Sequence, residues 1–208
     1  MKKRDFIRLG QQLVKDLPNG KVTGPEIVLC PVEHVLRGIT FESSSFDAKT
    51  FFVWFFCLPL CVPTNHLYFN FGDRLRTAGG ADVWNADDHD LLSDLRRAIS
   101  EQAVPYLSSV TTLEEMVRVL TDSPRPPAHR RQAIAYALAR VGKLTEAEVA
   151  LNELILTLDN NTAWQRVIAD RAESLLAQLR SDPAAAQAQL ENWEAQTIKN
   201  LNLDQVCR

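Results

Sequence analysis

The first twenty residues carry an amphipathic pattern. Apolar side chains recur there at spacings of three and four: Phe6, Leu9, Leu13 and Leu17. That spacing places them on one face of a helix. Pro18-Asn19-Gly20 follows, with residue types that favour a turn. The pattern therefore predicts a helix over residues 5–17.

The next region has the alternation of β-strands. Apolar and polar or small residues alternate over residues 35–41, as in a half-buried strand. Residues 50–58 are nearly all apolar or aromatic, which is typical of a central strand covered on both faces. A third strand is predicted over residues 66–76. Since the connections are short, we expect an antiparallel meander.

From residue 84 onward the pattern is helical. Asp87 and Asp88 suit the positive end of a helix, so we expect one from there to residue 103, before an interruption at Pro105. Two overlapping capping boxes then predict a short helix to residue 120: Thr111 with Glu114, and Thr112 with Glu115.

Residues 128–208 carry four more helical patterns with their own start and stop signals. The predicted helices cover residues 128–141, 145–158, 162–179 and 182–197. Their signals are Gly142 after the first, Thr145 with Glu148, Thr162 with Gln165, and Asp182 with Pro183.

Together these patterns predict an α+β fold, with an N-terminal helix and antiparallel β meander followed by an all-helical C-terminal half. Residues 123–127 read Ser-Pro-Arg-Pro-Pro, a composition typical of a linker. We therefore expect an α+β domain over residues 1–122 and a helical-hairpin subdomain over residues 128–208.

Composition narrows the classes of partner. The chain has 208 residues, with 23 Lys and Arg against 26 Asp and Glu and a net charge of −3. No clustered basic patch of the kind that binds nucleic acid is evident.

The longest apolar stretch, Phe51 to Val62, is shorter than the roughly 20 residues of a membrane helix. Without a secretory signal near the N-terminus, we expect a cytoplasmic protein that does not enter a membrane.

The four cysteines are Cys30, Cys57, Cys61 and Cys207. In a cytoplasmic protein, free thiols are expected. Cys57 and Cys61 lie too far apart along a strand for a disulfide or a shared zinc ion, although His66 follows at loose ligand spacing. We interpret both as small buried hydrophobic residues.

Sequence motifs for catalysis are absent. We find no glycine-rich phosphate loop, no Gly-x-Ser-x-Gly elbow and no His-Glu-x-x-His motif. The sequence therefore predicts a protein with no catalytic residues, metal or cofactor, more readily than an enzyme.

One acidic segment is a candidate binding site, together with a nearby arginine. The candidate binding residues are Arg74, Asp82, Trp84, Asp87, Asp88 and Asp90. Three interpretations stay open: carboxylates at a helix N-terminus, a metal site with His89, and an acidic contact patch for a basic partner. Trp84 lies outside any apolar stripe and is expected at a contact surface. Trp54, Trp164 and Trp193 lie within apolar patterns and are expected in the core.

Two resemblances bear on function. The run Ala135, Leu138, Gly142, Leu144, Ala147, Leu151 resembles one tetratricopeptide-type helix pair. The aromatic stretches Phe51 to Phe56 and Leu67 to Phe71, with Gly72, Arg74 and Trp84, resemble a bacterial domain-of-unknown-function type. Proteins of that type sometimes act as immunity proteins, which implies a toxin as the partner.

The leading hypothesis is a non-enzymatic protein-binding module, in its narrower form an immunity-type protein that binds and neutralises its partner. The first alternative is a helical-repeat-like adaptor that binds a peptide through residues 128–200. The second is an enzyme with an unrecognised site near His89 or Cys57.

Overall fold

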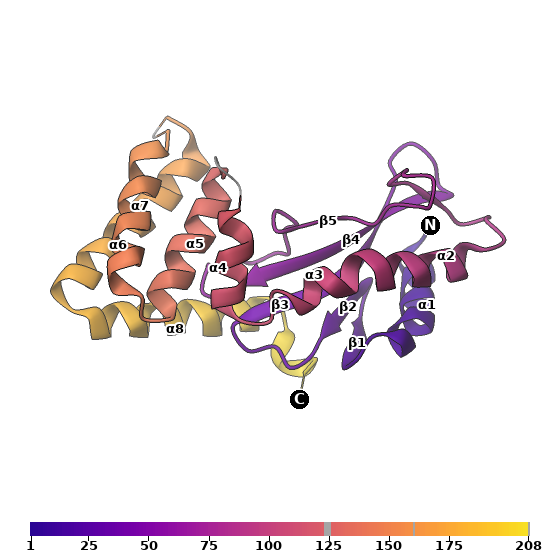
Figure 1. Ribbon diagram of the computed structural model, residues 1–208, viewed down its shortest axis with the longest axis horizontal. Coiled ribbons are helices and arrows are strands. Elements are labelled where there is room, and N and C mark those ends of the chain that lie inside the picture. The colour runs from indigo at the N-terminus through magenta and orange to yellow at the C-terminus, as the bar shows by residue number, and fades with distance from the viewer. Residues whose placement is uncertain (123–125, 160, 208) are drawn as a thin grey trace. The chain divides into compact units, whose positions relative to one another are not determined.

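The computed structural model describes residues 1–122, 126–159 and 161–207 (Figure 1). It confirms the predicted α+β class: an N-terminal helix and an antiparallel sheet precede a helical C-terminal half. The chain packs as two compact units. We call them the sheet unit (Met1–Leu58, Phe71–Thr111 and the described residues after Asn202) and the helical unit (Pro59–Asn70 and the described residues of Thr112–Asn202).

These units differ from the division read from the sequence. The segment Pro59–Asn70 lies in the helical unit, although its neighbours on both sides lie in the sheet unit. Residues 123–125 of the predicted linker lie outside the described residues. The boundary between residues 122 and 128 stays a prediction about independent folding, because compact packing does not show that either part folds alone.

The sheet has the strand order β1-β2-β3-β4-β5, with β6 also paired to β4. The paired strands whose register is known run antiparallel, as the predicted meander requires. The bounds are β1 Gly20–Thr23, β2 Glu26–Leu29, β3 Val35–Ser43, β4 Thr50–Pro59, β5 Gly72–Arg74 and β6 Trp84–Asn85. Strands β1 and β2 were not predicted; they form a hairpin of two four-residue strands joined at Gly24, which has a φ of +62°.

The prediction that residues 50–58 form a central strand is confirmed, since β4 pairs along both edges. Coverage on both faces was predicted as well, and it holds only for the second half of β4. In the first half, Phe51 and Val53 are fully buried, whereas the alternate residues Phe52 and Trp54 are half-buried. β4 therefore begins with one face toward the helices and one face partly open to solvent.

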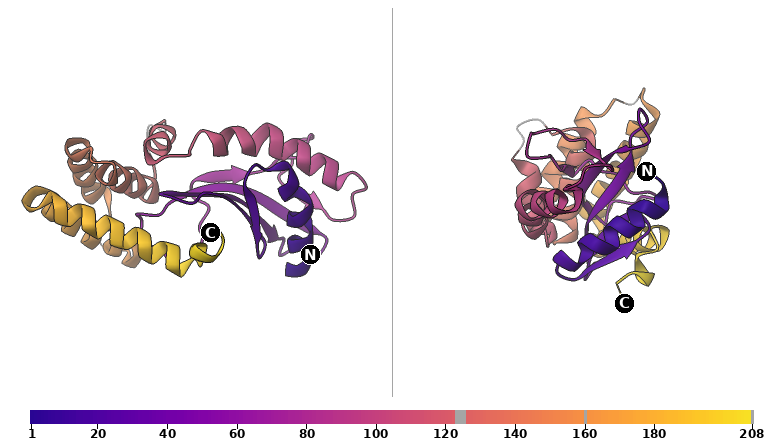
Figure 2. Two further views of the ribbon diagram at one scale, coloured as in Figure 1. Left: turned by 90° about the horizontal axis from the view of Figure 1, so that it is seen from below. Right: turned by 90° about the vertical axis from the view of Figure 1, so that its right-hand side faces the viewer.

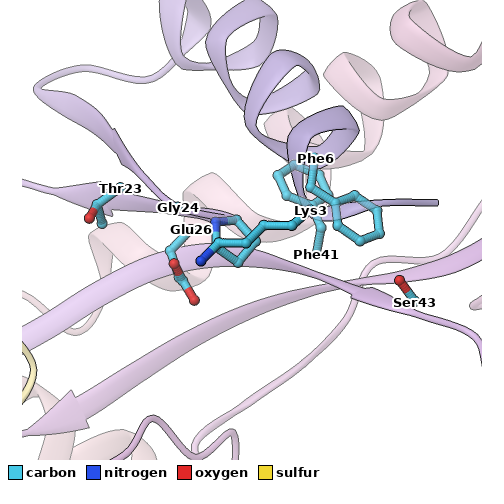
Figure 3. A pocket seen from close by; sticks show the side chains of 8 residues that line it. Lys3, Phe6, Thr23, Gly24, Glu26, Phe41 and Ser43 are labelled. Atoms are coloured by element: carbon cyan, nitrogen blue, oxygen red, sulfur yellow. The ribbon is translucent and has the colours of Figure 1, made fainter.

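The core of the sheet unit lies between the sheet and two helices, one that precedes the strands in sequence and one that follows them. Helix α1 (Lys3–Leu13) and helix α2 (Leu91–Ala98) contribute to one cluster of buried side chains with Phe51, Val53 and Phe55. Phe6 of α1 stacks on Phe41 of β3 with ring centroids 5.7 Å apart (Figure 3).

Helix α2 begins later than predicted and ends differently. It starts at Leu91 rather than at Asp87 or Asp88. Pro105 was expected to interrupt the helix, but the chain continues through a π-helical turn, Ile99–Ala103, into α3 (Val104–Ser108). Proline has no N–H to donate and crowds the preceding turn. A local π turn is one of the few ways in which a helix can accommodate such a disruption.

The predicted strand over residues 66–76 is wrong for most of its length, because only Gly72–Arg74 form β5. The residues before Phe71 belong to the helical unit instead. The Thr64 amide donates to the Thr197 hydroxyl at 3.4 Å, and the Asn200 side chain donates to the Thr64 carbonyl at 3.0 Å. Alternation alone does not distinguish a strand from an extended segment that packs on helices.

The helical unit contains α4 Leu113–Thr121, α5 Ala128–Arg140, α6 Leu144–Thr157, α7 Ala163–Ser181 and α8 Pro183–Asn200 (Figures 1 and 2). Helix α5 packs against α4, α6 and α8, and α7 packs against α6 and α8. None of the helices in the described part of the chain combines the length and the apolar composition that a membrane span requires.

The start and stop signals of these helices have mixed outcomes. The capping box of Thr112 with Glu115 and the N-cap at Asp182 are confirmed, and Gly142 follows α5 with a φ of +79°. Thr145 is not a cap, because α6 begins one residue earlier, at Leu144. Thr162 precedes α7 as predicted, but its hydroxyl donates to Asp159 rather than capping the helix.

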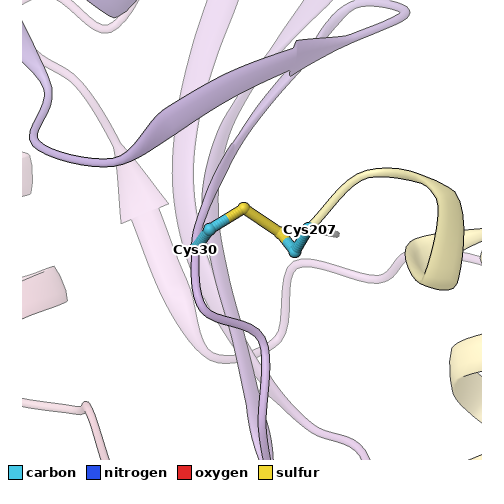
Figure 4. The surroundings of a disulfide bond; sticks show 2 residues. All are labelled: Cys30 and Cys207. Atoms are coloured by element: carbon cyan, nitrogen blue, oxygen red, sulfur yellow. A yellow bond between two sulfur atoms is a disulfide. The ribbon is translucent and has the colours of Figure 1, made fainter.

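The expectation of four free thiols is wrong for two cysteines. Cys30, which follows β2, forms a disulfide with Cys207 near the C-terminus, with Cα atoms 5.6 Å apart and a sequence separation of 177 (Figure 4). The fold brings these positions together, and no local pattern reports that proximity. Cys57 and Cys61 are fully buried thiols outside any disulfide, as predicted. Burial raises the pKa of Cys61 to about 12, so its thiol stays protonated.

Candidate functional site

Arg74 and Asp82, two of the predicted binding residues, pair with each other. The Arg74 Nη1 donates to Asp82 Oδ2 at 2.9 Å, and this hydrogen bond holds the pKa of Asp82 below its usual value. The guanidinium also lies 3.8 Å from the ring centroid of Phe52 and 4.6 Å from that of Trp54. Arg74 is thus already engaged by a carboxylate and two aromatic faces.

Trp84 is not at a surface. It lies opposite Phe51 in the pairing of β6 with β4, and only 3% of it is exposed. Its indole Nε1 donates to the Leu75 carbonyl at 3.1 Å. The expectation that Trp84 forms a contact surface is therefore wrong: strand pairing turns the ring into the core.

The remaining acidic candidates lie around the start of α2. Asp87 pairs with Lys49, and the Lys49 Nζ lies 2.5 Å from the Asp87 Oδ2. This hydrogen bond raises the pKa of Lys49. Asp88 and Asp90 are exposed, and Asp90 precedes α2 without a side-chain capping hydrogen bond. This arrangement matches the interpretation of carboxylates at a helix N-terminus. Within the described residues, no three His, Cys, Asp or Glu side chains gather as a metal site requires.

The sheet unit has a hollow beside α1 and the β1–β2 hairpin, with a volume of about 580 Å³ (Figure 3). Lys3 and Glu26 both line it with their side chains close together (Figure 3), and burial raises the pKa of Glu26. Because the ammonium and the carboxylate offset each other, this hollow has little net charge with which to attract a ligand.

The helical unit contains a concave site with a different character, which we call the aromatic cleft. Its volume is about 410 Å³, within the range of ligand sites. Helix α7 contributes residues at the spacing of one helix face, and α5 and the segment Val62–Asn70 supply the rest. The side chains used below are His66, Tyr68, His129, Gln132, Trp164 and Arg171.

Aromatic rings form the wall of this cleft. The rings of His129 and Trp164 stack with centroids 4.7 Å apart and an interplanar angle of 19°. Tyr68 approaches His129 with centroids 6.4 Å apart. Trp164 remains 46% exposed and Val167 48% exposed. Partial burial lowers the pKa of His129, so the ring is neutral at neutral pH.

The polar groups of the cleft are mostly hydrogen-bond donors or dual-function amides. Arg171 lines it from α7 and Gln132 from α5, and Asn70 lines it from the end of the segment Val62–Asn70. The buried hydroxyl of Tyr136, one turn beyond Gln132 on α5, interacts with the Gln132 side chain. A flat apolar wall next to a guanidinium can accept a planar or apolar group and an anion side by side.

Comparison of the chain with protein-family models, with curated proteins and with solved structures finds no match. The two resemblances drawn from the sequence therefore stay predictions. The site rests on its own geometry.

Sequence reasoning missed the aromatic cleft for identifiable reasons. Trp164 begins the apolar stripe of α7 and was expected in the core, but the stripe is buried only from Ile168 onward. His66 and Tyr68 were assigned to a strand. The one signal for the cleft is that three apolar residues and one arginine share a helical face: Trp164, Val167, Ile168 and Arg171.

Proposed function

We propose that this chain is a non-enzymatic protein-binding module that holds a segment of a partner protein in the aromatic cleft. The observation that carries the proposal is the half-exposed Trp164, stacked on His129 at the edge of a concave site. Tryptophan and arginine are the residues that most often dominate binding energy at protein interfaces. An exposed ring that is already held in place loses little conformational freedom on binding.

This proposal combines two of the sequence-based hypotheses. The adaptor hypothesis placed peptide binding in residues 128–200, which include both cleft-lining helices, α5 and α7. The cleft also uses His66 and Tyr68 from the segment between β4 and β5. A fragment that starts at residue 128 would lack these two side chains, so the full chain is the protein to test.

A selection experiment tests the proposal. A display library of random linear peptides is selected on the purified full chain, in parallel with the Trp164→Ala variant. We expect a family of related peptides to be enriched on the wild-type chain and to be lost on the variant. Because Trp164 is half-exposed, its replacement leaves the fold intact, and circular dichroism of the variant confirms this.

Leu156→Ala is the matched control. Leu156 is an apolar residue of the same unit, 84% exposed, and it lies outside the aromatic cleft. The peptides selected on the wild-type chain should bind this variant unchanged. Peptides that bind all three proteins equally, or an absence of enrichment, would contradict the proposal.

An immunity-type role is the narrower form of the proposal, with a toxin as the partner. It rests on the resemblance noted in the sequence, and its test is direct. The product of a gene encoded beside this one should form a stable complex with the purified chain and lose its activity there. A neighbouring gene product that stays active in the presence of the chain would remove this role.

The cytoplasmic location is a separate proposal, and the disulfide weighs against it. Disulfides persist mainly in oxidising compartments. Alkylation of the chain in intact native cells, before lysis, measures whether Cys30 and Cys207 are thiols there. A fully alkylated chain supports a cytoplasmic location, and a protected pair places the chain in an oxidising compartment.

A further inference from the structure

Arg171 has a charge that no carboxylate offsets among the described residues. Two other arginines of the helical unit have such partners: Arg140 lies 3.2 Å from Glu194, and Arg180 lies 2.7 Å from Glu148. Arg171 differs from them in lining the aromatic cleft, on the same face of α7 as Trp164. The cleft is therefore positively charged on its α7 side.

The surroundings of Arg171 are partly shielded from water. Arg171 is half-buried, and Gln132 beside it is 3% exposed. Burial raises the pKa of the Tyr136 hydroxyl to about 12, and the Gln132 side chain and the Arg171 guanidinium both oppose that rise. Electrostatic attraction at such a site is screened less than at an open surface.

The remaining ionisable groups of the cleft do not add negative charge. His129 is neutral at neutral pH, and His66 is exposed at the edge. An anion in the cleft thus meets a guanidinium, two amide side chains and imidazoles, with no carboxylate among the lining residues. This charge arrangement favours a carboxylate ligand.

We propose that the aromatic cleft selects an internal acidic segment of a partner protein. An Asp or Glu of that segment accepts hydrogen bonds from Arg171, while a neighbouring apolar or aromatic side chain lies against Trp164. An internal residue is favoured over a free C-terminus because terminal carboxylates are typically held by backbone N–H groups, whereas the donors here are side chains. This inference rests on the function proposed above, and it names the chemistry of the bound segment.

The experiment uses the same random peptide library on three full-length proteins: the wild type, Arg171→Gln and Arg166→Gln. Arg166 is an exposed arginine of α7 outside the cleft, so its variant controls for the loss of one positive charge. We expect the wild type and Arg166→Gln to enrich peptides with Asp or Glu next to an apolar residue. We expect Arg171→Gln to lose that acidic preference.

A synthetic pair then measures the effect. In the most enriched peptide, Asp or Glu is changed to Asn or Gln, and both peptides are titrated by fluorescence anisotropy. The acidic peptide should bind the wild type about tenfold more tightly than its amide counterpart, in line with a charge-assisted hydrogen bond. Arg171→Gln should bind the two peptides equally, and Arg171→Lys should restore part of the difference.

The outcomes separate the two proposals. Peptides that depend on Trp164 but show no acidic preference would overturn the role of Arg171 and leave the binding module in place. An acidic preference that survives in Arg171→Gln would overturn it as well. If no peptide depends on Trp164, both proposals fail.

Discussion

The two units use the same residue types in opposite ways. In the sheet unit, the ring of Trp84 is buried, and the charges of Arg74 and Asp87 are paired with Asp82 and Lys49. In the helical unit, Trp164 is half-exposed, and Arg171 has no carboxylate partner among the described residues. The difference indicates that the sheet unit satisfies its own side chains, whereas the helical unit leaves some for a ligand.

The cause of this difference lies in the secondary structure. A short strand such as β6 gains hydrogen bonds only by lying against β4, and this pairing turns Trp84 inward. The hydrogen bonds of helix α7 run along its own backbone and need no neighbouring strand, so a side chain at its first turn can remain at the surface. A tryptophan that is suited to binding can therefore be exposed at the end of a helix without destabilising that helix.

The largest expected effect comes from the disulfide of the sheet unit. Reduction of Cys30–Cys207, or the double variant Cys30→Ala with Cys207→Ala, should lower the free energy of unfolding by up to about 5 kcal/mol. That value is the loop-entropy estimate for a cross-link of this span. Urea unfolding with and without reductant measures it. Reductant should have no effect on the double variant, and an unchanged midpoint for the reduced wild type would show that the cross-link does not stabilise the fold.

The second prediction compares the two tryptophans directly. Trp84→Ala should lower the free energy of unfolding by about 4 kcal/mol, the usual range for a large buried aromatic residue. Trp164→Ala should cost less than about 1 kcal/mol, because the ring is half-exposed. Urea unfolding of both variants is the measurement. Equal losses would remove the distinction between a core tryptophan and a binding tryptophan.

Much of the fold was predictable because periodicity reports burial. The stripe of α1, the apolar run of β4 and the Asp182-Pro183 start of α8 all lie where the pattern placed them. The β1–β2 hairpin was missed because four-residue strands contain too few positions for alternation to be recognised. The disulfide was missed because its two cysteines meet only through tertiary structure.

The candidate site was less predictable than the fold. The sequence shows which residues are aromatic or charged, but not which of them have partners. Arg74 and Asp82 were both candidate binding residues, yet their pairing with each other leaves less for a ligand. Trp84 and Trp164 were assigned to the wrong environments, because strand pairing and helix ends override the local pattern. Charge compensation depends on tertiary contacts, which the local sequence does not encode.

A smaller effect is expected from pH, through the wall of the cleft. Burial lowers the pKa of His129 in the folded chain below its ordinary value of 6.5. The unfolded chain therefore binds the proton first, and the contribution of the neutral ring to stability is lost as the pH falls from 6.5 through the folded-state pKa. Urea unfolding between pH 7.5 and 5.5 should show this decline.

His129→Phe preserves an aromatic ring beside Trp164 and removes the titration. The decline in stability between neutral and mildly acidic pH should therefore become shallower in this variant. His89→Phe is the control, since His89 has a side chain exposed at 98%. A decline of the same slope in His129→Phe and the wild type would show that another group is responsible.

The smallest effect is expected from the acidic candidates at the start of α2. Asp88→Asn with Asp90→Asn should change the free energy of unfolding by about 0.5 kcal/mol or less, since both side chains are exposed and Asp90 makes no capping hydrogen bond. The same double variant should bind the selected peptides with an affinity within about twofold of the wild type. Titration at low and high salt is the measurement. A large loss of binding at low salt that shrinks at high salt would instead place the contact surface on the sheet unit, because salt screens the attraction between exposed carboxylates and a basic partner.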